Sequence, residues 1–310
     1  MKCIKLFFFA TMILLSACGT ARIFRAVGSE TISQTSFKVD IPFIYPKNDR
    51  IFVPVFFEKE NTTRHLLFDT HAPFAMAKSV INGNPAYSKI GKFILPKPTP
   101  DGKTIPNIFY KTQGIKFGNI QFNDVVVNET PDKIKDTASF FYEGIFGNTL
   151  MVKGIWKVDF EHNVLTFASS IDSISQISEA YRLQTVFNGT KINVFLLFEN
   201  GVRQKIDLDL GYSGPVILPK KEFDKIDVNH KAVVTEGSTT SAAGKQKTKI
   251  YALDATPFKI GDKDFKLSIR STDNVKLKLM GLKFFSQFKF VVFDYLNQAI
   301  YVSNEKMPTK

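Results

Sequence analysis

The amino-acid sequence predicts an all-β protein with few short helices. Phenylalanine supplies 31 of the 310 residues and gathers with valine, isoleucine and tyrosine in short runs such as 51–57. Glycine, asparagine, aspartate and proline separate these runs, which is the pattern of β-strands joined by turns. Helical periodicity is confined to the segments 150–156, 173–182, 220–226 and 284–288. With 44% hydrophobic and 23% charged residues, the composition is that of a folded protein with one large domain or two smaller ones.

The N-terminus has the architecture of a secretory signal. A basic start is followed by the apolar stretch 6–17, which is shorter than the roughly 18 residues that a spanning helix needs. The stretch ends in Leu15-Ser16-Ala17-Cys18, which resembles the lipobox of bacterial lipoproteins. The resemblance implies a signal peptide over 1–17, a lipid on Cys18 and a lipidated tether over 18–40 that attaches the protein to a membrane. An ordinary signal followed by a chance cysteine is the alternative.

The residues around Cys18 also bear on location and partners. No acidic residue occurs over 19–27, which resembles outer-membrane lipoproteins that face the periplasm. The formal charge is +12, but the lysines are scattered along the chain. We therefore expect solvated faces near an anionic membrane and no nucleic-acid partner. Cys3 leaves with the signal and Cys18 carries the lipid, so disulfides, cysteine-metal sites and thiol catalysis are not expected.

The two halves of the chain repeat one pattern. In the first half, strands over 52–58 and 65–69 form an apparent hairpin that runs into Asp69-Thr70-His71. In the second half, strands over 194–199 and 204–209 form another hairpin, which runs into Asp209-Leu210-Gly211. Asp69 and Asp209 therefore lie 140 residues apart at the ends of equivalent strands.

Further landmarks follow in the same order in both halves. Each half has a strand, a tight turn and a strand, and then a hydrophobic-hydrophobic-glycine segment that ends at Gly147 or Gly281. A closing hairpin comes last and contains Asp159 in the first half and Asp294 in the second. We predict a first lobe over 41–170, a connector over 171–181, a second lobe over 182–304 and a tail over 305–310.

These motifs resemble those of bacterial aspartyl proteases of the retropepsin-like group, in a single-chain form that holds two copies of the lobe. In that family each lobe has a strand ending in Asp-Thr/Ser-Gly, a flap hairpin, a hydrophobic-hydrophobic-Gly segment and a closing hairpin. The resemblance covers residues 41–303 and rests on the duplicated order of the motifs. It implies two closed β-barrel lobes related by a pseudo-twofold axis, with a cleft between them.

The resemblance makes Asp69 and Asp209 a catalytic pair. Hydrolysis of an amide without a covalent intermediate needs one group to take a proton from water and another to protonate the carbonyl oxygen, and two carboxylates that share a proton can do both. Thr70, His71, Leu210 and Gly211 are the supporting residues of the two triads, and Gly147 and Gly281 are the psi-loop glycines. Two positions depart from the family pattern, because His71 replaces a glycine and Leu210 replaces a hydroxyl residue.

Several residues have more than one interpretation. An aspartate at a strand end is usually a turn or capping residue, which is also the expectation for Asp159 and Asp294. His71 is a third catalytic group, a metal ligand or a hydrogen-bonded surface residue; the last is favoured because no metal-binding histidine spacing occurs. The flap candidates are 98–110 and 236–251, and the second also fits a mobile loop.

Two functions are compatible with this pattern. The first is a membrane-anchored aspartic-type endopeptidase that hydrolyses peptide bonds with water activated between Asp69 and Asp209. The second is a catalytically degenerate lipoprotein that binds a peptide or partner protein in the cleft between the lobes. Neither function calls for a cofactor or a metal. Because one chain holds both lobes, we expect a monomer.

Overall fold

The computed structural model describes residues 22–23, 25–93, 97–98, 104–132, 143–229, 231–241 and 244–307. The predicted all-β class is confirmed, with 53% of the described residues in strands and 12% in helices. Besides the helical residues 22–23 and 25–26, the α-helices are α2 (Lys78–Ile81), α3 (Asn148–Met151), α4 (Lys220–Asp224) and α5 (Leu282–Phe285). None of the helices in this part of the chain has the length and apolar character needed to cross a membrane.

Three of the predicted helices differ in the structure. The helix expected over 284–288 begins and ends earlier, as α5. The helix expected over 150–156 begins and ends earlier, as α3, because Ile155 and Trp156 are fully buried and start a strand. The segment 173–182 forms no α-helix. It starts at the last residue of the 3₁₀ turn η3 (Ile171–Ser173), contains the 3₁₀ turn η4 (Ile177–Glu179) and then enters a strand.

A ten-stranded sheet contains most of the first half of the chain. Its order is β1-β11-β10-β3-β4-β13-β5-β12-β9-β6. Most neighbours are antiparallel, but β13 is parallel to β4 and β12 is parallel to β5. The strands are β1 (Thr31–Ile32), β3 (Phe52–Phe57), β4 (Thr62–Asp69), β5 (Ala75–Ala77), β6 (Ser88–Lys92), β9 (Ile108–Thr112), β10 (Ile115–Phe117), β11 (Ile120–Asn123), β12 (Val125–Thr130) and β13 (Gly144–Gly147).

An eight-stranded sheet repeats this arrangement in the second half. Its order is β17-β18-β19-β24-β20-β23-β22-β21, and the sheet curls so that β18 also pairs with β22. As in the first half, two pairs are parallel, β19 with β24 and β20 with β23. The strands are β17 (Thr185–Asn188), β18 (Lys191–Phe198), β19 (Arg203–Leu208), β20 (Val216–Pro219), β21 (Val233–Ser241), β22 (Gly244–Ile260), β23 (Lys263–Thr272) and β24 (Leu279–Met280).

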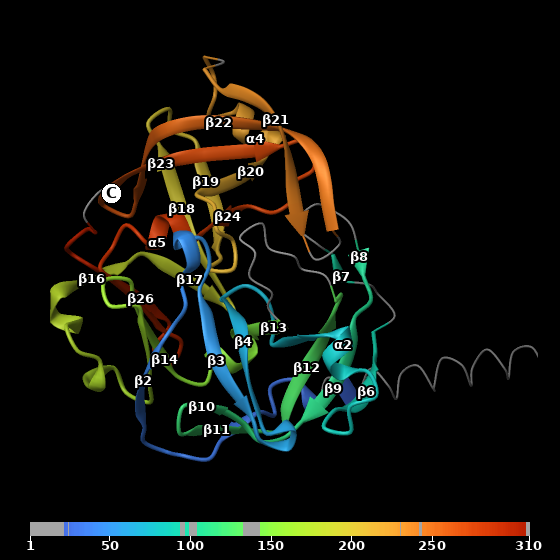
Figure 1. Cartoon of the computed structure of the whole chain (residues 1–310). Coiled ribbons are helices and arrows are strands. Elements are labelled where there is room, and N and C mark those ends of the chain that lie inside the picture. The colour runs from blue at the N-terminus through green and yellow to red at the C-terminus, as the bar shows by residue number, and fades with distance from the viewer. Residues whose placement is uncertain are drawn as a thin grey trace, which may run out of the picture.

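A six-stranded sheet joins the halves. Its order is β16-β26-β25-β14-β15-β2. It combines the closing hairpins of both halves with one strand that precedes each half. In Figure 1 it lies beside the two large sheets, of which the second-half sheet (yellow to orange) is above the first-half sheet (blue to green). The strands are β2 (Lys38–Pro42), β14 (Ile155–Asp159), β15 (Val164–Ala168), β16 (Ala180–Leu183), β25 (Phe290–Asp294) and β26 (Ala299–Ser303).

The contact between β14 and β25 has the symmetry of the repeat. Ile155 lies opposite Asp294, and Asp159 lies opposite Phe290. Under the 135-residue offset between the closing hairpins, Ile155 corresponds to Phe290 and Asp159 corresponds to Asp294. The two pairs are therefore the same contact made in both directions.

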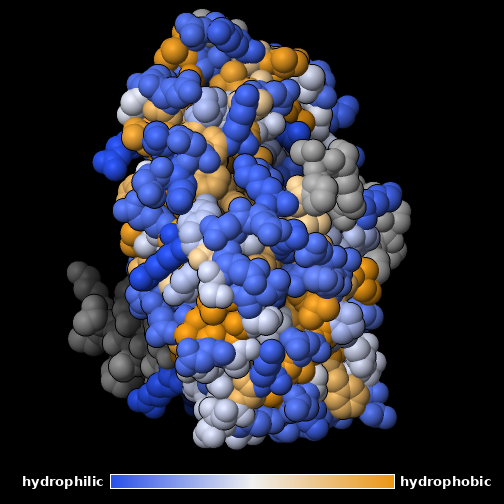
Figure 2. All heavy atoms as spheres, turned by 90° about the vertical axis from the view of Figure 1, so that its left-hand side faces the viewer, coloured by the Kyte–Doolittle hydropathy of each residue, from blue (hydrophilic) through white to orange (hydrophobic). Residues whose placement is uncertain are grey.

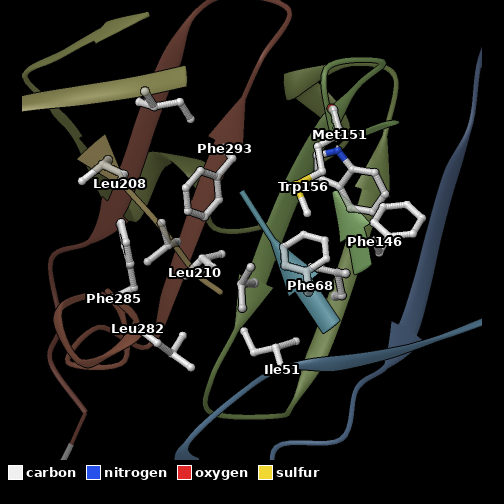
Figure 3. Close-up of a cluster of buried hydrophobic side chains, with 14 of the residues drawn as sticks. Ile51, Phe68, Phe146, Met151, Trp156, Leu208, Leu210, Leu282, Phe285 and Phe293 are labelled. Atoms are coloured by element: carbon white, nitrogen blue, oxygen red, sulfur yellow. Dashed lines mark hydrogen bonds between the residues drawn. The ribbon is translucent and has the colours of Figure 1, made fainter. Parts of the chain in front are cut away.

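One hydrophobic core runs through both halves, which explains the abundance of phenylalanine. Eleven of the twelve largest fully buried side chains are phenylalanines, and the twelfth is Trp156. The Trp156 indole stacks on Phe167 with ring centroids 3.9 Å apart. Figure 3 shows part of this cluster, with Phe68, Phe146 and Trp156 from the first half and Leu208, Leu210 and Phe293 from the second.

The surface is mixed in character. On the face shown in Figure 2, hydrophilic residues cover most of the area and hydrophobic residues form separate small patches. This distribution agrees with charges that are spread along the chain and not gathered in one segment.

Candidate active site

Asp69 and Asp209 occupy equivalent places in the two large sheets. Asp69 is the last residue of β4, where it lies opposite Gly147 of the parallel strand β13. Asp209 directly follows β19, and its backbone N–H donates to the carbonyl of Met280 on the parallel strand β24 at 2.9 Å. Both aspartates are buried, with 9% and 7% of their surface exposed.

Each aspartate accepts the same pair of backbone hydrogen bonds. Oδ1 of Asp69 accepts from the N–H groups of His71 and Ala72, both at 2.8 Å. Oδ1 of Asp209 accepts from those of Gly211 at 2.8 Å and Tyr212 at 3.2 Å. These contacts fulfil the turn role expected of an aspartate at a strand end. They use one oxygen of each carboxylate, so the turn role and a chemical role of the other oxygen are compatible.

Gly211 brings the two triads together. A Cβ atom at this position would overlap Oδ2, Cγ and Cβ of Asp69. The absence of a side chain therefore lets the Asp69 carboxylate lie directly against the loop that carries Asp209.

Thr70 links the triads through its hydroxyl group. Its Oγ1 donates to the carbonyl oxygen of Leu208 at 3.3 Å and accepts from the N–H of Leu210 at 3.0 Å. The equivalent residue, Leu210, is fully buried and belongs to the hydrophobic cluster drawn in Figure 3. Only one of the two equivalent residues therefore makes the link. The Thr70 hydroxyl bonds to the backbone of the second triad, whereas the Leu210 side chain contributes apolar packing.

The two carboxylates interact electrostatically. Burial and, after it, the nearby charge of Asp69 together raise the pKa of Asp209 to about 7, whereas a positive charge on His71 opposes the shift. Asp209 therefore stays protonated over a pH range in which an exposed aspartate is ionised. Two adjacent carboxylates that cannot both ionise share one proton, and the proton belongs to the pair.

His71 forms a pair with an acidic residue of the other half. Its Nε2 lies 3.1 Å from Oδ2 of Asp207 on β19. Burial disfavours the imidazolium, but the hydrogen bond with Asp207 and the charges of Asp209 and Asp69 together raise the pKa of His71. Burial likewise disfavours the Asp207 carboxylate, yet the hydrogen bond from His71 and the charges of His71 and Lys191 hold the pKa of Asp207 below its usual value.

Sequence reasoning did not single out Asp207. A signal was present, because the 140-residue offset of the repeat aligns Asp207 with Leu67, so a charged residue stands where the other half has an apolar one. Its neighbour Asn193, whose Nδ2 donates to Oδ1 of Asp207, was missed for the same reason. The role of Asp207 and Asn193 can be recognised only once His71 is known to lie beside Asp207.

Gly147 and Gly281 pack against the loops that follow the aspartates. A Cβ atom on Gly147 would overlap backbone atoms of Ala72 and Pro73, and one on Gly281 would overlap the carbonyl oxygens of Tyr212 and Gly214. The next residues hold the same loops, since the N–H of Asn148 donates to the Ala72 carbonyl at 2.8 Å and that of Leu282 to the Tyr212 carbonyl at 2.7 Å. Each glycine thus allows its strand to lie close to the backbone of the loop that follows an aspartate, and this contact holds the loop in place.

We expect Gly147→Ala to lower the free energy of unfolding by about 3 kcal/mol, the upper part of the usual range for overpacking, because its nearest neighbours are all backbone atoms that cannot rotate away. Gly83→Ala is the matched control. It has open space around it and a φ of 70°, so only the left-handed backbone opposes the change, at about 1 kcal/mol. Denaturant unfolding of both variants measures the difference. Equal losses would show that the close approach is unimportant.

The remaining predicted residues fall in different places. Oδ1 of Asp159 accepts from the N–H groups of Glu161 and His162, and Oδ1 of Asp294 accepts from that of Asn297, so both hold turns as expected. The lipidation residue Cys18 lies outside the described residues. Within them, no group of three or more histidine, cysteine, aspartate or glutamate side chains is arranged to hold a metal ion.

The two flap candidates are only partly described. In the first, β7 (Lys97–Pro98) pairs with β8 (Thr104–Ile105), and residues 99–103 between them lie outside the described residues. In the second, β21 and β22 form a long hairpin that pairs from Val233 opposite Ala252 to Ser241 opposite Gly244. In Figure 1 these two strands form the top of the second-half sheet.

A comparison with protein-family models found no match to this chain, and a search of curated proteins found none either.

Proposed function

We propose that this protein is an aspartic-type endopeptidase in which Asp69 and Asp209 together activate water for attack on a peptide bond. The observation that carries the proposal is the pairing of two buried, equivalent strand-end carboxylates, one of which has a pKa raised by its burial and by the other. Perturbed carboxylates of this kind are characteristic of acid–base catalysis.

In the proposed mechanism, one proton is shared between the aspartates. The ionised carboxylate takes a proton from water, and the protonated one donates to the carbonyl oxygen of the substrate. Backbone N–H groups from His71, Ala72, Gly211 and Tyr212 hold the carboxylates in place. Thr70 keeps the loops at a fixed separation through Leu208 and Leu210. Roles are not divided between Asp69 and Asp209, because coupled groups titrate as a pair.

The proposed fold is the retropepsin-like one, with two β-barrel lobes about a pseudo-twofold axis and the substrate between them. Supporting this, the strand orders β3-β4-β13-β5-β12-β9 and β18-β19-β24-β20-β23-β22 correspond, and both contain the same parallel pairs. The reciprocal contact of β14 with β25 relates the halves. A single chain that carries both aspartates needs no second copy, so we propose a monomer.

The proposed location is the periplasmic face of a bacterial outer membrane, with attachment through a lipid on Cys18. The support is the lipobox-like ending of the apolar segment and the absence of acidic residues after it. The substrates would then be peptides or proteins of that compartment.

A degenerate homologue that binds a peptide or partner without cleaving it is the second candidate. Two observations favour it: Leu210 lacks the hydroxyl that would answer Thr70, and His71 places a ring beside the carboxylates. Both candidates predict peptide binding, and only the first predicts hydrolysis.

Cleavage of a peptide library by the purified protein between about pH 3 and pH 8 tests the proposal. A shared-proton pair predicts a bell-shaped profile whose alkaline limb lies near pH 7, because activity is lost as the pair releases its shared proton. Mass spectrometry of the products gives the cleavage sites. Binding of peptides without cleavage at any pH would support the second candidate.

A further inference from the structure

The polar contact between His71 and Asp207 breaks the symmetry of the repeat at two positions at once. Position 71 aligns with Gly211 and position 207 aligns with Leu67, so the other half has neither the ring nor the carboxylate. The two departures touch each other, with Nε2 of His71 3.1 Å from Oδ2 of Asp207. Two unrelated substitutions would not be expected to meet in this way.

A third position extends the same change. Asn193 lies opposite Asp207 in the β18–β19 ladder and donates a hydrogen bond to its Oδ1. In the first half, the residue opposite Leu67 is Phe52, which is fully buried. The apolar pair Phe52–Leu67 of the first half is therefore replaced in the second half by the hydrogen-bonded polar pair Asn193–Asp207. Because Asn193 bonds to Oδ1 of Asp207, Oδ2 is available to the imidazole of His71.

The charged groups around His71 favour the protonated form of its ring. Its neighbours among the described residues are the carboxylates of Asp207 on β19, Asp69 at the end of β4 and Asp209 after β19, and the ammonium group of Lys191 on β18. Lys191 Nζ lies 4.0 Å from Oδ2 of Asp207. The backbone N–H of His71 donates to Oδ1 of Asp69 at 2.8 Å, so a protonated imidazole on this residue places a positive charge beside the catalytic pair.

We propose that His71, oriented by Asp207, is a positioning residue that keeps a positive charge against Asp69 and Asp209 and thereby sets the upper pH limit of their shared-proton state. The ring acts through the carboxylates and takes no part in bond making. Its positive charge favours the ionised form of the pair, so the shared proton is released at a lower pH than burial alone would dictate. This inference rests on the proposed function only in treating Asp69 and Asp209 as catalytic residues.

The test is the titration of Asp209 in detergent-purified protein labelled with ¹³C at the aspartate carboxyl groups. In His71→Gln, which keeps a hydrogen-bonding side chain but no charge, we expect the titration midpoint of Asp209 to rise by about 1 pH unit or more. Asp207→Asn should shift it in the same direction, because the imidazole then loses its partner. The double variant should match His71→Gln, since both changes act through one charge.

His162→Gln is the matched control. Nδ1 of His162 forms the same kind of contact in the closing hairpin, 3.0 Å from Oδ1 of Asp159. The His162→Gln substitution should leave the titration midpoint of Asp209 unchanged. Because the titration needs no turnover, it distinguishes failure of this inference from failure of the proposed function. An active enzyme should also show its alkaline limb moved upward in His71→Gln. An Asp209 midpoint that is unchanged in folded His71→Gln and Asp207→Asn proteins would overturn the inference.

Discussion

Asp209→Asn is expected to abolish peptide cleavage, lowering kcat/KM on the order of 10⁴-fold or to the limit of detection. The amide oxygen can still accept the backbone N–H bonds that the carboxylate now accepts from Gly211 and Tyr212, so the loop should keep its conformation. What is lost is the ability to hold the shared proton, and general acid–base catalysis contributes about 10²–10⁴-fold for each group that acts.

The same substitution should stabilise the protein at neutral pH. The pKa of Asp209 is about 7 in the folded protein and 3.8 in an ordinary aspartate, so the folded state binds the extra proton between these values. Stability contributed by this group therefore falls as pH rises from about 4 to about 7, and asparagine removes that loss. A lower melting temperature for Asp209→Asn at pH 7 would contradict this explanation.

Asp294→Asn is the control for the first prediction. Asp294 is a fully buried aspartate at the end of a strand, and its Oδ1 accepts from the N–H of Asn297. Its two carboxylate oxygens bond to Asn297 and not to the catalytic pair, so its replacement should affect stability and leave cleavage within a few-fold of the parent. Retained activity in Asp209→Asn, after removal of contaminating peptidases, would exclude the catalytic role of this carboxylate.

Thr70→Val should reduce kcat about 100-fold while the protein remains folded. Valine has the shape of threonine but removes the hydroxyl that bonds to Leu208 and Leu210. With the loops no longer joined, a displacement of about 1 Å between the carboxylates costs on the order of 100-fold in rate. The buried partners left without the hydroxyl should lower the free energy of unfolding by about 1–3 kcal/mol.

Two matched variants separate these effects. Thr70→Ser keeps the hydroxyl and should restore most of the activity. Thr166→Val removes another buried hydroxyl, the one that bonds to Asp40 in the six-stranded sheet, and should lower stability without a specific loss of kcat. Equal kcat losses in Thr70→Val and Thr166→Val would show that Thr70 acts only through general stability.

The equivalence of the two halves was predictable from the sequence, because it depends on short patterns of neighbouring residues. A hydrophobic run, a turn and a strand ending in aspartate can be recognised twice from the sequence, and the structure places Asp69 and Asp209 at the ends of equivalent strands. The pairing of β14 with β25 was not predictable, since each closing hairpin has buried faces that could have been covered within its own half.

The polar network around Asp207 shows a different limit. Asp207 lies in a strand whose alternation of side chains resembles that of any half-buried strand, and its meaning depends on a histidine 136 residues away. Comparison of the repeats marks position 207 as unusual, but only the three-dimensional contact with His71 identifies its partner.

The coupling of the two carboxylates is tested most directly by the titration of Asp209 in the parent protein and in Asp69→Asn, followed through ¹³C-labelled aspartate carboxyl groups. We expect a midpoint of about 7 in the parent protein. In Asp69→Asn the midpoint should fall, because the neighbouring negative charge is gone, although burial should keep it above the ordinary value. A parent midpoint near that of an exposed aspartate, or one that Asp69→Asn leaves unchanged, would contradict the shared-proton pair on which the proposed function rests.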